Sequence, residues 1–355
     1  MDSARALGER LSIGGSGSMV PDPELAHPRL EIMHQGTAWH RAGVAASADQ
    51  HAAVERADRV IFPRGLELTD LRLWATDDPE DVIVEYRRTG ELWDGRPYAD
   101  GGLAIFEFQD GLVRRVRNFL NPAYTEAMTR GWEALVELGD LFQIPAWHSQ
   151  PLAPIDWRPH PPSPKAWRHD RPGPDWGSAP YSHAQRTHRH FGPKAHRTDD
   201  PFPVSPEGYT DFQGASWFLA GRSPASALTH DPANPFTRAL IALFTPPGGT
   251  EQTLQFTHFR TWAARDDVSI AFMEWTSQAV LFTGRAFRNH GATVLTFDAA
   301  GRRVAHREYC NVAYLEAVTA EADFPGLVGA AFSELPAAKT WGNASESWVP
   351  LPIEA

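Results

Sequence analysis

Cysteine, long apolar runs and clustered basic residues are scarce in this sequence of 355 residues. Cys310, the single cysteine, excludes an internal disulfide and a thiolate metal cluster built from this chain alone. No apolar run reaches the length of a membrane span, and no basic start followed by a hydrophobic stretch indicates a secretory signal. The formal net charge of -11 gives little support to a nucleic-acid partner. We therefore expect a cytoplasmic protein that binds neither nucleic acid nor membrane.

The motifs of several enzyme classes are also missing. We find no glycine-rich phosphate loop, no nucleophile elbow and no His-Glu-x-x-His zinc motif. Histidines are frequent over 160–196, but Arg and Lys residues stand between them and would repel a cation. We expect no metal and no cofactor.

What the sequence does contain is a repeat. Residues 307–317 read REYCNVAYLEA, and residues 117–127 read RNFLNPAYTEA, so the two stretches align without a gap. The telling difference is chemical, because Glu308 stands where Asn118 stands in the earlier copy. A carboxylate can transfer protons and an amide cannot. This position predicts that the two copies differ in activity.

Further matches extend the repeat over most of the chain. Residues 35–43 match 213–221, which makes Trp217 the counterpart of a tryptophan in the first copy. His51 and His230 are counterparts in the same way, and helical patterns cover roughly 49–61 and 236–244. Strand patterns with a period of two follow in both copies and include the pair Glu85 and Glu274.

These matches predict two α+β domains in one chain. A stretch rich in Gly, Ser and Pro precedes the first copy, and a stretch rich in Pro, Trp and His separates the copies. The predicted organisation is a flexible tail over 1–29, a first domain over 30–145, a linker strap over 146–206, a second domain over 207–335 and a C-terminal strap over 336–355.

The order of these patterns resembles the cone-shaped nuclear-transport-factor-2-like fold. Within that fold the chain is similar to SnoaL-like polyketide cyclases, and most of all to the phenazine-biosynthesis A/B proteins. Asn289-His290, the strand 293–297 and the motif at 307–311 carry this similarity in the second copy. The resemblance implies that each domain is a curved antiparallel sheet wrapped around a pocket with helices. It also implies an intramolecular pseudo-dimer, with further homo-oligomerisation left open.

The resemblance further implies an acid/base pair in the second domain. Glu308 matches the glutamate of the family's Arg-Glu-aromatic motif, and His230 or His290 would be its partner. The first copy has Asn118 and Gly101 at the matching positions, which predicts a supporting first domain and a catalytic second one. The expected substrate-binding residues are Trp217, Glu274, Trp275, Phe287, Cys310 and His51.

Several of these residues also have a structural interpretation. On a strand, Glu308 and Cys310 share one face, so both would line the same space. Glu308 could instead pair with an arginine, and a lone cysteine usually packs as a small core residue. A glutamate at the Glu274 position in both copies favours a shared structural task such as a buried ion pair. His230 and His290 could be solvated or hold structural hydrogen bonds.

The function expected from these observations is acid/base catalysis without a cofactor. We predict an enzyme of secondary metabolism that cyclises, condenses or isomerises a small molecule in the second domain. The alternatives are a protein that binds a small molecule without changing it, and a hydrolase or dehydratase of the same fold.

Overall fold

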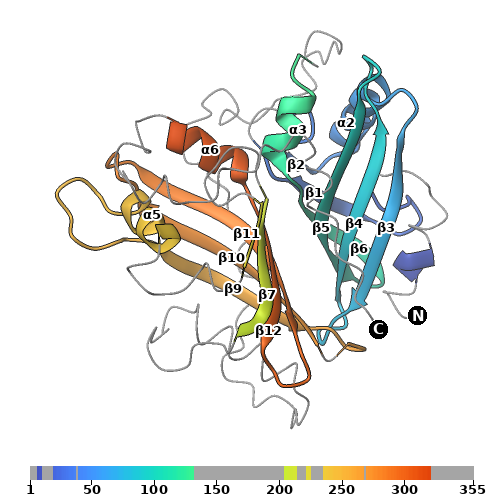
Figure 1. Cartoon of the computed structure of the whole chain (residues 1–355). Coiled ribbons are helices and arrows are strands. Elements are labelled where there is room, and N and C mark those ends of the chain that lie inside the picture. Colours follow the sequence, from blue (N-terminus) through green and yellow to red (C-terminus); the bar gives the residue numbers. More distant parts are fainter. Residues whose placement is uncertain are drawn as a thin grey trace. The chain divides into compact units, whose positions relative to one another are not determined.

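The computed structural model describes residues 6–9, 19–36, 39–131, 204–213, 221–224, 235–267 and 269–320. These residues form two compact units, one around the sheet β1–β6 and one around the sheet β7–β12 (Figure 1). The expected straps at 146–206 and 336–355 lie outside the described residues, except that 204–206 begin strand β7. Trp217 and His230 also lie outside the described residues. Duplication and the pseudo-dimer stay predictions.

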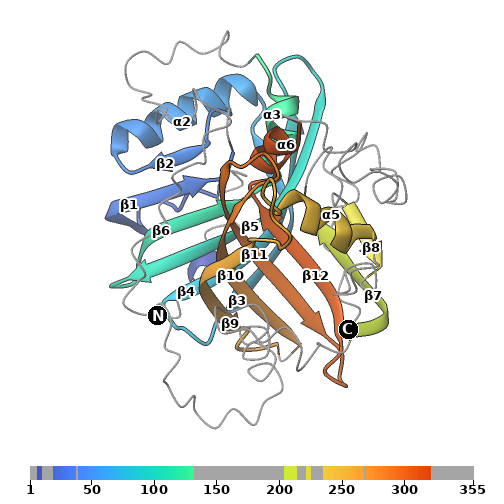
Figure 2. The ribbon, with the colours of Figure 1, turned by 90° about the vertical axis from the view of Figure 1, so that its left-hand side faces the viewer.

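The first unit is a six-stranded sheet with two helices. Its strands follow the order β2-β1-β6-β5-β4-β3, and α2 lies alongside β2 (Figure 2). The bounds are β1 Ala26–His34, β2 Gly43–Ala45, α2 Ala48–Ile61, β3 Leu66–Ala75, β4 Asp81–Glu91, β5 Pro97–Gln109, β6 Leu112–Phe119 and α3 Pro122–Met128.

The second unit repeats this arrangement with the strand order β8-β7-β12-β11-β10-β9. The bounds are β7 Val204–Phe212, β8 Gly221–Pro224, α5 Pro235–Leu243, β9 Gln255–Ala263, β10 Ile270–Val280, β11 Ala286–Phe297, β12 Arg303–Cys310 and α6 Val312–Ala320. The repeated motif at 307–317 therefore spans the end of a strand and the start of a helix.

Both sheets are mixed, whereas the sequence predicted antiparallel ones. β1 runs parallel to β6, and β7 runs parallel to β12. The reason is that these neighbours are far apart in the chain, so no hairpin forces them to run in opposite directions. The remaining ladders are antiparallel.

The range predicted as a tail contributes to the first unit. β1 starts at Ala26, inside that range. Leu7 and Met19 are fully buried and belong to the core cluster of the first sheet, with Trp39 and Phe106 among its members. Burying these apolar side chains offsets the entropy cost of ordering a glycine-rich segment, which composition could not show.

Local signals fix the main helix and the main hairpin as the sequence indicates. Ser47 caps α2 by accepting a hydrogen bond from the Gln50 amide, and the Gln50 side chain accepts one from the Ser47 amide. Asp110 and Gly111 form a two-residue turn between β5 and β6, both with positive φ. Asp110 adopts φ 53° there, a conformation that Asp tolerates better than most residues.

Each sheet has one face that packs against its helices, which we call the helix face. In the first unit, Tyr98 of β5 lies on this face, because its ring is 5.0 Å from that of Phe62 after α2 and its hydroxyl is 3.1 Å from Thr125 of α3. In the second unit, Phe287 of β11 stacks on Tyr314 of α6 and contacts Phe244 after α5. Side chains that alternate with these lie on the opposite face.

Candidate functional site

Glu308 lies on the helix face of the second sheet, beside a histidine that sequence reasoning had not selected. β12 pairs with β11 so that Glu308 is directly opposite Thr293. His306, two residues earlier on the same face, brings its Nε2 atom to 3.0 Å from Glu308 Oε2. The side chain of Glu308 is 17 % exposed, and among the described residues its Oε1 atom has no hydrogen-bond partner. One carboxylate oxygen is therefore held while the other is available.

A β-bulge adds Arg303 to this face. The register shifts between Thr296 and Phe297, so that Phe297 is opposite Arg303. The extra residue in β12 puts Arg303 on the same face as His306, although the two are three positions apart. Its NH1 atom lies 3.4 Å from His306 Nδ1.

This contact determines which nitrogen of His306 carries the proton. A guanidinium can only donate hydrogen bonds, so Nδ1 of His306 must accept from Arg303. In the neutral ring, Nε2 then bears the hydrogen and donates it to Glu308. Arg303, His306 and Glu308 form one hydrogen-bonded row.

Burial sets the protonation of the groups beside Glu308. Burial lowers the pKa of His306, and the charge of Arg303 lowers it further, while the hydrogen bond with Glu308 opposes both. Burial raises the pKa of Cys310 well above its usual range, and the charge of Glu308 adds to this shift. His306 is therefore neutral near pH 7, and Cys310 is a thiol that packs beside Glu308 on the same face, as strand alternation predicts.

Aromatic side chains also lie on the helix face of the second sheet. Trp275 of β10 is buried and donates a hydrogen bond from Nε1 to Thr293 Oγ1 at 2.9 Å. It lies opposite Gly291, where a Cβ atom would come within 2.3 Å of the indole. Phe287, also buried, occupies the same face nearer the helices. Trp275 and Phe287, both expected to bind substrate, thus lie on the face that carries Glu308.

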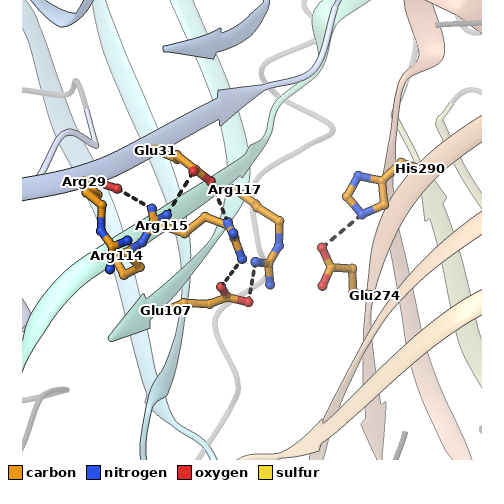
Figure 3. Close-up of polar contacts among 8 residues, drawn as sticks. All are labelled: Arg29, Glu31, Glu107, Arg114, Arg115, Arg117, Glu274 and His290. Atoms are coloured by element: carbon orange, nitrogen blue, oxygen red, sulfur yellow. Dashed lines mark hydrogen bonds and ion pairs between the residues drawn. The ribbon is translucent and has the colours of Figure 1, made fainter. Parts of the chain in front are cut away.

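His290 and Glu274 lie on the opposite face, so His290 is not the partner of Glu308. Their alternation with Thr293 and Trp275 places them there, and His290 Nε2 is 2.9 Å from Glu274 Oε1 (Figure 3). Both side chains are buried, at 7 % and 8 % exposed. The sequence could not show this separation, because it depends on the register in which β11 pairs with β12.

The opposite face of the first sheet carries charged networks instead. Glu107 binds both Arg115 and Arg117, at 2.7 Å and 2.6 Å, and Glu31 binds Arg114 and Arg115 (Figure 3). Partial burial alone would raise the pKa of Glu31, but Arg114 and Arg115 together lower it below its usual value. This face has the signature of a structural ion-pair network.

His51 lies on α2, half-buried, with Nε2 3.5 Å from the Leu30 carbonyl oxygen. Burial lowers the pKa of this histidine, and the backbone contact opposes the shift. Its counterpart His230 is outside the described residues, as is Trp217. The role expected for all three stays a prediction.

The first unit carries a dense polar cluster around α2, which sequence reasoning had not anticipated. Asp58 of α2 binds His40 at 2.6 Å and Arg41 through two hydrogen bonds, one of them 2.8 Å from Nε. Burial alone would raise the pKa of Asp58, but the charge of Arg41 and the hydrogen bond from His40 hold it well below its usual range. Asp58 is therefore ionised and neutralises Arg41.

A second buried ion pair lies on the helix face of the first sheet. Arg88 donates to Asp100 from Nε at 2.7 Å and from NH2 at 2.9 Å, and both side chains are at most 1 % exposed. Tyr98 donates a short hydrogen bond to the same carboxylate. Burial, followed by the charge of Asp100, raises the pKa of Tyr98 well above its usual range. This bidentate geometry satisfies Asp100 fully.

Counterparts at the two sheets show how differently their helix faces are built. The register that sets His34 beside Asn118 in the first sheet sets Phe212 beside Glu308 in the second. At the bulge, Val113 of the first sheet stands where Arg303 stands in the second. A comparison of every aligned pair in the two repeats, and not of the motif alone, would have shown that polar residues in one sheet match apolar residues in the other.

Within the described ranges, no group of three or more His, Cys, Asp or Glu side chains is arranged to hold a metal ion. Nor does any described helix have the length and apolar character needed to cross a membrane.

No family model matches the sequence, and no curated protein matches it. Several solved structures are similar to about a third of this chain. A phenazine biosynthesis-related protein from Pseudomonas aeruginosa is 21 % identical, with 36 % of this chain and 84 % of that chain covered and a TM-score of 0.30. A candidate SnoaL-like polyketide cyclase from Jannaschia sp. is 18 % identical over 36 % of this chain and 90 % of that chain, with a TM-score of 0.27.

An NTF2-like protein from Anabaena variabilis is 14 % identical over 34 % of this chain and 90 % of that chain, again with a TM-score of 0.27. The structural neighbours thus include an NTF2-like protein, a SnoaL-like protein and a phenazine-related one. Identities and TM-scores this low assign no activity to the chain.

Proposed function

We propose that the second unit is an acid/base catalyst that acts on a small organic molecule, with Glu308 as the group that transfers the proton. The observation that carries the proposal is the row Arg303–His306–Glu308, which holds Oε2 and leaves Oε1 available. Because neutral His306 donates to the carboxylate, it orients Glu308 without neutralising its charge. The reaction class is cyclisation, condensation or isomerisation, as in the secondary-metabolite enzymes that the sequence resembles, and it needs no cofactor.

The roles of the neighbouring residues follow from their places on the helix face. His306 and Arg303 are positioning residues, since neither needs to touch the substrate. Trp275 and Phe287 supply apolar walls for a planar substrate. Cys310 contributes packing and no thiolate chemistry.

A general-base probe tests this assignment without knowledge of the natural substrate. In 5-nitrobenzisoxazole, a base takes the proton from the ring C–H, the electron pair forms a nitrile and the N–O bond breaks to release a coloured phenolate. We expect the chain to open this ring faster than acetate at the same concentration and pH. Glu308→Gln should lower the rate about a hundredfold, the usual contribution of a positioned base.

His290→Gln is the matched control, because it alters an acid/base residue of the same strands on the opposite face. Its rate should stay within a few-fold of the unmodified chain. Equal rates for Glu308→Gln and the unmodified chain would contradict the proposal and favour a protein that only binds its ligand. If His290→Gln lowered the rate of ring opening instead, the active site would lie on the opposite face of the sheet.

A further inference from the structure

Two neighbouring side chains on the helix face of the first sheet have buried polar atoms without partners. The parallel register of β1 and β6 sets His34 beside Asn118. The two residues are 5 % and 1 % exposed. Among the described residues, neither Nδ1 of His34 nor Nδ2 of Asn118 makes a hydrogen bond. An unpaired buried polar atom destabilises a fold, so two at adjoining positions require an explanation.

Two aromatic residues contact these side chains, and one of the contacts orients the Asn118 amide. Tyr86 places its hydroxyl 3.5 Å from Asn118 Oδ1, so the amide oxygen faces Tyr86 and Nδ2 points away from it. The ring of Trp39 meets that of His34 edge-on, with the ring centres 5.4 Å apart. Trp39 and Tyr86 are both buried.

Two nearby arginines favour a hydrogen-bond acceptor with negative charge beside His34 and Asn118. Burial lowers the pKa of His34 well below its usual range, and the charges of Arg41 and Arg88 lower it further, while Asp58 opposes them. His34 is therefore neutral at pH 7 and offers one N–H group. The charges of Arg41 and Arg88 disfavour a proton on His34 and favour an anion beside it, whereas burial disfavours a charge of either sign.

We propose that His34 and Asn118 bind the carboxylate of a small planar aromatic acid in the first unit. Asn118 donates one hydrogen bond from Nδ2, and the Nδ1–H tautomer of His34 donates the second, so that each carboxylate oxygen accepts one. The indole of Trp39 and the ring of Tyr86 contact the apolar part of the ligand. The site binds its ligand and breaks no bond.

The second unit offers no such pair at the same register. Phe212 stands beside Glu308 there, an apolar ring and an acceptor that would repel a carboxylate. The binding site is therefore specific to the first unit, and its occupancy is independent of catalysis at Glu308.

The test uses benzoate as the probe and the full chain as the protein. Isothermal titration calorimetry measures affinity, and ¹⁵N-labelled histidine followed by two-dimensional NMR reports on each imidazole. Benzoate at millimolar concentration should move the His34 signal, which is identified by its absence in His34→Phe. His34→Phe and Asn118→Leu should each weaken binding about tenfold or more.

Two matched variants locate the site. His27→Gln changes another histidine of β1, at an exposed contact with the Arg29 amide, and should leave benzoate affinity unchanged. Glu308→Gln should also leave it unchanged. The proposal is overturned if no His34 signal moves with benzoate in the unmodified chain, or if Glu308→Gln and not His34→Phe abolishes binding. Where His34→Phe does not fold, His34→Gln identifies the same signal, so the NMR readout on the unmodified chain still decides the matter.

Discussion

His306 Nε2 lies 3.0 Å from Glu308 Oε2, and the two residues are two positions apart on β12. A strand turns both side chains to the same face, so this contact needs no long-range rearrangement. Arg303 fixes the direction of this hydrogen bond, because the bulge in β12 brings its guanidinium to the other nitrogen of the His306 ring. His306 Nε2 is then the donor and Glu308 the acceptor. The protonation of His306 is therefore the quantity that reports on the whole row.

Removing the guanidinium should raise the pKa of His306. Arg303→Met deletes a positive charge that lowers this pKa and leaves the favourable hydrogen bond with Glu308 in place. An NMR titration of the His306 imidazole measures the change. Arg302→Met is the control, since Arg302 pairs with Asp298 in the exposed turn and should leave the His306 pKa unchanged. A lower or unchanged value in Arg303→Met would contradict the proposed row.

The free energy of unfolding should fall on mild acidification. Burial lowers the pKa values of His34, His40 and His306 in the folded chain, whereas unfolded histidines titrate at about 6.5. Below about pH 6.5 the unfolded chain binds more protons than the folded one, so the free energy of unfolding decreases as pH falls toward the folded-state values. Above that pH the contribution is fully present.

Urea unfolding at pH 7.5 and at pH 5.5, about one unit either side of that value, measures this effect. Paired carboxylates such as Asp58 contribute only at lower pH, because their unfolded values are about 4. His34→Phe should remove part of the pH dependence, and an identical slope in the variant would show that His34 does not contribute.

Breaking the buried ion pair of the first unit should destabilise it strongly. Asp100→Asn leaves the Arg88 guanidinium buried without a counter-charge, at a cost of roughly 3–5 kcal/mol. Chemical denaturation measures the change. Glu91→Gln breaks the exposed pair with Arg64 and should cost at most about 1 kcal/mol. Equal effects of the two variants would mean that burial does not control the strength of these pairs.

Gly291 should tolerate no side chain. A Cβ atom there would lie 2.3 Å from Trp275 Cζ2, so Gly291→Ala must push the indole from its hydrogen bond with Thr293. We expect a loss of about 1–3 kcal/mol, the usual cost of overpacking. Gly8→Ala is the control, because its Cβ atom would meet only Leu73 at an ordinary 3.5 Å. Thermal unfolding of both variants measures the difference, and equal stability would show that Trp275 has room to move.

Local patterns of the sequence predicted much of the secondary structure. The predicted helices near 49–61 and 236–244 correspond to α2 and α5. Strand alternation placed Glu308 and Cys310 on one face correctly. These features depend on residues close together in the chain, where capping, turn geometry and periodicity act directly.

The tertiary structure decided which residues meet. It showed that the sheets are mixed, that Leu7 and Met19 enter the first core, and that a bulge turns Arg303 toward His306. It also separated His290 from Glu308, two acid/base residues that the sequence motif had joined.

The division has one physical reason. Helices, turns and the alternation along a strand follow from interactions within a few residues, so the sequence alone determined them. Register, strand direction and bulges follow from pairing between distant segments, where a shift of one residue changes the face of every side chain. Only the folded chain fixes that pairing, and with it the residues that share a face with Glu308 or stand beside Asn118.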